Sequence, residues 1–310
     1  MPEVQITIES LMKNRPIVIA VDPTSLLAAD TVGNNGVHPC LYPLHHRKEA
    51  IELITALMNK GILVLTPTLY SNPLNVEFAL GLEGMAFHLN LESARLTRKA
   101  VGKGFPIGGL MSIELGLELI GPRRDISERQ IIRAFAEQAE ALVIGGVNYL
   151  VLTGIKNSDI LRRIINGIRF SASCPNSNNS KIIFTLPIEE ACRIQDGSEI
   201  PTLVKIVQET GNVLAAGVTL DFAELSDSLE RIRKLSVQLG NIPVIVMLEG
   251  NYRYADNGRE IVPTLDVVQI QTAIEKLKGC EVSIVGFTHG VTLKLVQELS
   301  RHQVPLPEAT

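Results

Sequence analysis

The stretch EVSIVGFTHG, residues 281–290, indicates the fold more clearly than any other part of the chain. Its first half is a short, continuous apolar run, as expected of a strand buried on both faces of a parallel sheet. The run ends on Thr288 and His289, and a helical pattern of apolar residues follows Gly290. A strand that ends on polar side chains and leads into a helix is the repeating unit of an α/β barrel.

Further units of the same kind precede this one. Helical patterns separate them, for example residues 128–144 after the N-cap candidate Ser127. Such alternation predicts a parallel sheet with right-handed crossovers. With residues 281–286 as the eighth strand, the other apolar strand cores are residues 16–21, 62–65, 105–110, 149–152, 182–186, 212–220 and 243–248.

Eight strand–helix units predict an α/β fold, a single (β/α)8 TIM-type barrel that forms one domain over residues 1–310. An open, doubly wound sheet is the alternative, and it would carry a phosphate-binding glycine loop after the first strand. The turn there, residues 22–25 (DPTS), contains neither GxGxxG nor GxxxxGK[ST], which favours the barrel. Residues 1–15 read as a mixed, partly charged lead-in.

The composition is that of a globular protein with one large core: 310 residues, 45% apolar and 20% charged. A net charge of −4 gives no electrostatic reason to expect nucleic acid or an anionic membrane as a partner. No stretch approaches the ~20 uninterrupted apolar residues of a membrane span, and no secretory leader is visible.

We expect a cytoplasmic protein with a small-molecule ligand; a homo-oligomer stays possible. The four cysteines form no CxxC pair and are expected to be reduced packing residues.

Residues directly after the strands of a closed barrel converge on one funnel, where barrels carry out chemistry. Carboxylates and an imidazole can exchange protons there, so Asp221, Glu249 and His289 are the catalytic candidates. The alternatives are a hard-metal site built from these residues and, for the carboxylates, simple N-capping of the next helix. No metal or cofactor is predicted. The expected substrate-binding residues are Asp22, Thr66, Thr68, Thr153 and Thr288.

Several segments resemble the homocysteine S-methyltransferase family over nearly the whole chain. Residues 134–152, AFAEQAEALVIGGVNYLVL, are similar to the family segment FxEQxEALVEAGVDLLLIET. Residues 217–220, GVTL, fall on the family's GVNC, and residues 286–290, GFTHG, fall on its GGCCG. The resemblance implies a homocysteine-binding barrel and methyl transfer to a thiol.

The resemblance also implies three thiolates that hold zinc, which would bind homocysteine as its thiolate. A free thiol has a pKa of about 8.5, and a metal lowers it. The matching positions here are Leu220, Thr288 and His289, so we expect a divergent member without the zinc-binding cysteines. Cys280 precedes the eighth strand and would lie at the opposite end of the barrel.

Three functions therefore stay open. The first is transfer of a methyl or similar small group without the thiolate zinc site. The second is a different acid–base reaction on the same barrel. The third is a non-catalytic protein that binds or responds to a small molecule. The fold alone cannot rank them.

Overall fold

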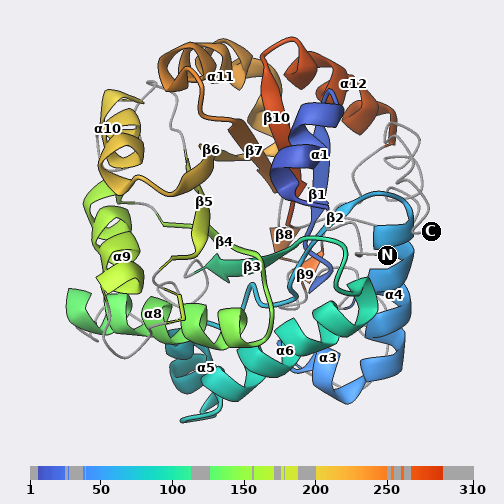
Figure 1. Ribbon diagram of the computed structural model, residues 1–310, viewed down its shortest axis with the longest axis vertical. Helices are drawn as coiled ribbons and strands as arrows, with labels where there is room; N and C mark the ends of the chain where they lie inside the picture. Colours follow the sequence, from blue (N-terminus) through green and yellow to red (C-terminus); the bar gives the residue numbers. More distant parts are fainter. Residues whose placement is uncertain are drawn as a thin grey trace.

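A computed structural model describes residues 6–24, 27, 38, 40–112, 126–155, 157–170, 176–177, 179–187, 200–249, 253–254, 260–261 and 267–288. Eight parallel strands form a closed barrel in the order β1-β10-β7-β6-β5-β4-β3-β2 (Figure 1). The predicted (β/α)8 barrel is confirmed, and the open sheet is wrong. The barrel strands are β1 (Val18–Val21), β2 (Leu63–Leu65), β3 (Ile107–Ser112), β4 (Tyr149–Thr153), β5 (Lys181–Pro187), β6 (Val213–Asp221), β7 (Val244–Glu249) and β10 (Val282–Phe287).

Helices surround the strands on the outside of the barrel (Figure 1). A separate antiparallel pair, β8 (Arg253–Tyr254) and β9 (Glu260–Ile261), lies in the connection between the last residue of β7 and the next helix. The helices are α1 (Ile8–Asn14), α3 (Tyr42–His45), α4 (Arg47–Asn59), α5 (Pro73–Leu80), α6 (Ala86–Val101), α8 (Glu128–Ile144), α9 (Ser158–Phe170), α10 (Ile200–Thr210), the 3₁₀ turn η1 (Phe222–Glu224), α11 (Leu225–Leu239) and α12 (Val267–Lys278).

Helix α1 lies across one end of the barrel, the end nearer the viewer in Figure 1. Thr7 caps it, because the Thr7 and Ser10 side chains each bond the other residue's backbone. Ile8 and Leu11 are buried in the main core. Glu9 forms an ion pair with Lys181, the first residue of β5, so α1 covers the N-terminal end of the strands. The lead-in expected from the sequence is thus partly a helix.

The strands pack as the apolar pattern predicts. Every residue of β1, β2, β3 and β4 is buried. Two glycines allow close approach inside the sheet. A Cβ at Gly217 would lie 1.7 Å from the Ile245 carbonyl oxygen, and one at Gly286 would lie 2.0 Å from the Met247 sulfur. No other residue type fits these two positions without a shift of the neighbouring strand or side chain.

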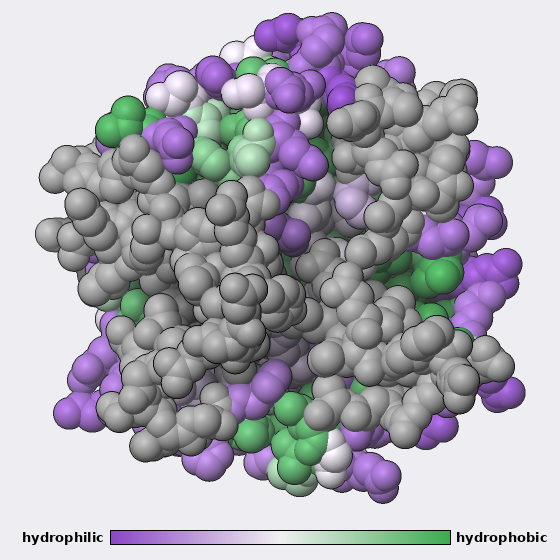
Figure 2. Space-filling view, turned by 180° about the vertical axis from the view of Figure 1, so that it is seen from behind, coloured by the Kyte–Doolittle hydropathy of each residue, from purple (hydrophilic) through white to green (hydrophobic). Residues whose placement is uncertain are grey.

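The outward sides of the helices are mostly polar, as the described residues visible from behind show (Figure 2). Amphipathic helices of this kind bury one face on the barrel and leave the other to water. Within the part of the chain that the structure describes, no helix combines the length and apolar character needed to span a bilayer.

Candidate active site

Four adjacent strands carry polar side chains at the same level of the C-terminal rim. Asp221 and Glu249 are register partners at the ends of β6 and β7. The Thr288 N–H donates to the Leu248 carbonyl at 3.3 Å, and the Asp22 N–H donates to the Phe287 carbonyl at 2.9 Å. Pairing therefore continues past the ends of β10 and β1. Asp221, Glu249, Thr288 and Asp22 follow one another around the rim.

The threonine cluster, Thr153, Thr185 and Thr219, identifies the inner face. The Thr153 hydroxyl lies 3.0 Å from that of Thr219, although β5 separates their strands. Side chains two strands apart meet inside a barrel, because the radius is smaller there than outside. Side chains alternate along a strand. Thr219 and Asp221 therefore both point inward, and so does Glu249 as the register partner of Asp221.

The hydroxyl protons of the threonine cluster are all donated to hydrogen bonds within the cluster. Thr185 donates to Thr153 at 3.1 Å, and it lies 2.6 Å from the Thr219 hydroxyl. With the Thr153–Thr219 contact of 3.0 Å, three hydroxyl groups share three hydrogen bonds. Each bond consumes one proton, so the cluster has only oxygen lone pairs left to offer. Thr153 was predicted as a site residue, whereas Thr185 and Thr219 were missed.

Asp22 is fully buried at the end of β1. Its Oδ1 atom accepts from the Thr24 backbone at 2.9 Å and from the Thr24 hydroxyl at 2.6 Å. Its Oδ2 atom is buried and has no hydrogen-bond partner among the described residues. Burial raises the pKa of the Asp22 carboxyl to about 7, although the bonds from Thr24 lower it in part. Asp22 is thus a buried acid that titrates near neutral pH with one oxygen left over.

Asp221 behaves as the capping alternative describes. Its Oδ1 atom accepts from the Ala223 N–H at 2.9 Å and caps the turn η1, and its side chain is partly exposed. Glu249, the last residue of β7, is also partly exposed, and Thr288 is buried. His289 lies outside the described residues. The structure therefore brings two of the three catalytic candidates, Asp221 and Glu249, together as neighbours on the rim.

Thr66 and Thr68 fasten the end of β2 to β3. The Thr68 hydroxyl donates to the Leu110 carbonyl at 2.6 Å, and the Leu110 N–H donates to the Thr66 hydroxyl at 3.0 Å. Their hydroxyls lie 2.7 Å apart. Since Thr68 has given its proton to Leu110, Thr66 donates to Thr68. Both protons are used within the protein, so these residues have no free donor for a ligand.

A comparison with family models matches residues 59–302 of this chain to the homocysteine S-methyltransferase family. This match covers most of the chain. The chain belongs to that family. A comparison with curated proteins gives no match.

Solved structures of homocysteine methyltransferase MmuM from Escherichia coli have the same fold as this family member. The metallated form has a TM-score of 0.73 at 15% identity, and the alignment covers 96% of this chain and 99% of that one. The oxidised form has a TM-score of 0.74 at 14% identity, with the same coverage. The carboxyl transferase domain Y628A of Rhizobium etli pyruvate carboxylase with pyruvate has a TM-score of 0.52 at 11% identity. That alignment covers 94% of this chain and 48% of the other chain. At these identities the likeness shows the fold alone.

Two of the positions that the family resemblance assigns to zinc-binding cysteines are described. Leu220 is 4% exposed and packs in the main core, and Thr288 is fully buried. Neither carries sulfur, so this donor set does not fit a three-thiolate zinc site. Cys280 precedes β10 at the other end of the barrel. Among the described residues, no three His, Cys, Asp or Glu side chains lie close enough together to hold a metal ion.

Proposed function

We propose that this family member binds a small metabolite with an amino group, an amino-acid-like compound, in the funnel at the C-terminal rim. We further propose that it transfers a methyl or similar small group on this metabolite without a thiolate-bound zinc. The observation that carries the proposal is the second carboxyl oxygen of Asp22, which is buried and has no partner in the described part of the chain.

An ammonium group suits this oxygen better than any neutral group does. A buried carboxylate without a partner is unfavourable, and an ammonium supplies both hydrogen-bond donors and the opposite charge. Binding an ammonium would also lower the raised pKa of Asp22, so that the carboxyl ionises when the ligand arrives. The threonine cluster, which offers lone pairs and no donors, adds to the preference for a donor-rich ligand.

Methyl transfer is supported by membership of the homocysteine S-methyltransferase family. In such a transfer the acceptor atom forms a bond to the methyl carbon while the bond from that carbon to the donor breaks. A thiol acceptor must also lose its proton. Leu220 and Thr288 cannot act as thiolates, so the proton would pass to a carboxylate of the rim.

A different acid–base reaction is the second candidate. The observation that favours it is the pKa of Asp22, about 7, because a general acid or base works best near the operating pH. In that case Asp22 exchanges a proton with the substrate instead of holding its ammonium group. The two candidates differ in whether the ligand requires an amino group.

A matched pair of compounds tests the first proposal. Calorimetry would compare L-homocysteine with 4-mercaptobutyrate, which lacks only the amino group. We expect homocysteine to bind more tightly, and Asp22→Asn to remove the difference by weakening homocysteine alone. Asp227→Asn, an exposed aspartate on α11, is the control and should change neither affinity. Equal affinity for the two compounds would overturn the assignment of the amino group to Asp22.

Turnover needs a separate measurement. Homocysteine would be incubated with S-methylmethionine or betaine as methyl donor, and methionine would be detected by mass spectrometry. Formation of methionine at a rate that depends on the protein supports methyl transfer. Binding of homocysteine without methionine formation would leave the ligand site in place and reject this reaction.

A further inference from the structure

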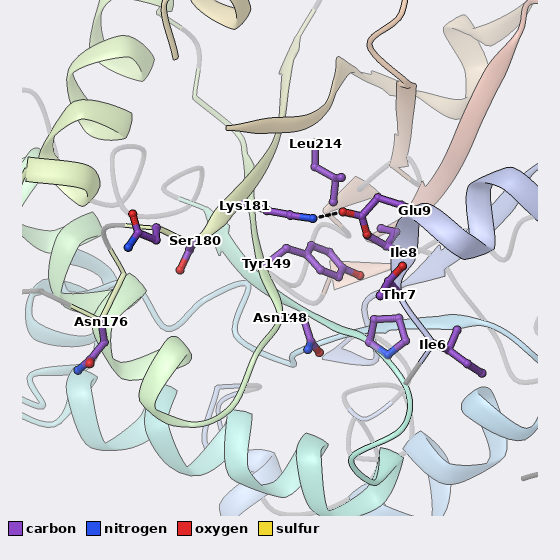
Figure 3. Close-up of a pocket in the computed structure, with 12 residues that line it drawn as sticks. Ile6, Thr7, Ile8, Glu9, Asn148, Tyr149, Asn176, Ser180, Lys181 and Leu214 are labelled. Atoms are coloured by element: carbon purple, nitrogen blue, oxygen red, sulfur yellow. Dashed lines mark hydrogen bonds and ion pairs between the residues drawn. The ribbon is translucent and has the colours of Figure 1, made fainter. Parts of the chain in front are cut away.

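A cavity of about 400 Å³ lies at the N-terminal end of the barrel, the end opposite to the candidate active site. It is partly open to solvent and lies between the start of α1 and the first residues of β4, β5 and β6 (Figure 3). Ile6, Ile8, Pro106 and Leu214 form its apolar wall. Characterised barrel enzymes carry their chemistry at the C-terminal face, so this cavity is not part of that site.

Tyr149 lines this cavity and is 1% exposed. Its hydroxyl has no hydrogen-bond partner among the described residues. Figure 3 shows the ring next to the Lys181–Glu9 pair, with the hydroxyl directed toward the first residues of α1. Burial raises the pKa of this hydroxyl, and the positive charge of Arg98 offsets the rise only in part. The group therefore keeps its proton and needs an acceptor.

Lys181 and Glu9 also line the cavity and form an ion pair with each other. The side chains are 56% and 40% exposed, and both are long and flexible. Their charges cancel each other, so this pair offers no free counter-charge to a charged ligand. An uncharged molecule loses less hydration than a charged one on entering the cavity, so it does not need a counter-charge there.

We propose that this cavity binds a small uncharged molecule with an apolar body and one carbonyl oxygen. The carbonyl accepts the proton of the Tyr149 hydroxyl, and the apolar body packs against Ile8 and Leu214. The exposed Lys181 and Glu9 side chains shift so that the carbonyl can reach the buried hydroxyl. This site is independent of the function proposed for the C-terminal rim, and no reaction takes place in it.

Caprolactam is a suitable probe, because it combines one carbonyl with an apolar ring. A titration followed by ¹H–¹⁵N NMR would compare it with cyclohexylamine and cyclohexanecarboxylate, which carry opposite charges on a similar ring. We expect saturable binding of caprolactam with a dissociation constant on the order of 1 mM. Neither charged compound should bind as tightly.

Two variants connect the binding to this cavity. Tyr149→Phe removes a hydroxyl that has no partner in the described part of the chain, so it should fold normally and bind caprolactam roughly three- to tenfold more weakly. Leu214→Trp fills the cavity and should abolish binding. Tyr42→Phe, the same change at a buried tyrosine of α3, is the control and should leave the affinity unchanged.

The proposal fails if caprolactam gives no saturable shifts at 10-fold the expected dissociation constant, as it would if water alone occupied the cavity. It also fails if Tyr149→Phe binds as tightly as the parent protein. Asp22→Asn should not affect this titration, so the two sites can be judged separately.

Discussion

The hydroxyl groups of Thr185 and Thr219 lie 2.6 Å apart on neighbouring strands, and each also contacts Thr153. Since all three hydroxyls are buried, each bond replaces contacts that water would otherwise provide. Loss of one member leaves the other two without a full set of partners.

Thr219→Val keeps the shape of the side chain and removes its hydroxyl. We expect the free energy of unfolding to fall by about 1–3 kcal/mol, because buried polar groups lose their partners. Urea denaturation followed by circular dichroism measures this. Thr272→Val on α12 removes an exposed hydroxyl that donates to the Val268 carbonyl of the same helix, so it should change stability by less than about 0.5 kcal/mol. Equal effects of the two changes would contradict the role given to the cluster.

Asp22 should make stability depend on pH. Its folded pKa is about 7, whereas an unfolded aspartate has a pKa of about 3.9. The folded state therefore binds the proton more tightly, and this contribution to stability is present below about pH 4 and is lost as pH rises through 7. Between pH 5 and pH 8 the unfolding free energy should fall more in the parent protein than in Asp22→Asn, by an amount on the order of a few kcal/mol. Asp227→Asn should follow the parent protein, and an unchanged pH profile in Asp22→Asn would reject the raised pKa.

The two close-packed glycines should respond differently to alanine. At Gly286 the added Cβ meets the flexible Met247 side chain, whereas at Gly217 it meets the Ile245 backbone. We expect Gly286→Ala to lower stability by about 1–3 kcal/mol and Gly217→Ala to lower it further. In thermal unfolding, the melting temperature of the double variant Gly286→Ala, Met247→Ala should be no lower than that of the single variant Met247→Ala. No second change at position 247 should rescue Gly217→Ala.

Gln138 of α8 joins three segments of the outer layer. Its amide accepts from Asn72 at 3.1 Å and donates to Asn90 at 3.1 Å, and all three residues are buried. Gln138→Met preserves length and leaves both asparagines short of a partner, which should lower the unfolding free energy by about 2–3 kcal/mol. Gln238→Met, at an exposed position of α11, is the matched control for urea denaturation. A loss no larger than that of the control would show that these amide bonds contribute little.

The barrel could be predicted from the sequence because its strands are buried on both faces and therefore read as continuous apolar runs. Helix α1 could not be predicted in the same way. It has only seven residues, and its capping box pairs Thr7 with Ser10, whereas the usual signature has Glu or Gln at that position. Its stability comes from Ile8 and Leu11 in the core, a tertiary effect that a local pattern does not reveal.

The site was predicted in part for a related reason. We took the first polar residue after each predicted strand as a candidate. This rule selected Asp22, Asp221 and Glu249, which the structure places on one rim. The same rule overlooked Thr185 and Thr219, because they lie within strands and face inward only by alternation. Their meeting with Thr153 depends on the register of β4, β5 and β6, which a single sequence does not specify. The roles of these residues stay predictions.

The pairing of β1 with β10 has a consequence for biosynthesis. The first barrel strand leaves the ribosome long before the last one. The edge of β1 that pairs with β10 therefore stays unpaired until nearly the whole chain has been made. Unpaired strand edges are sites of aggregation, and pairings distant in sequence form slowly. A chain that stops before β10 would leave both β1 and β7 with exposed edges, and such truncated products should depend on chaperones or precipitate.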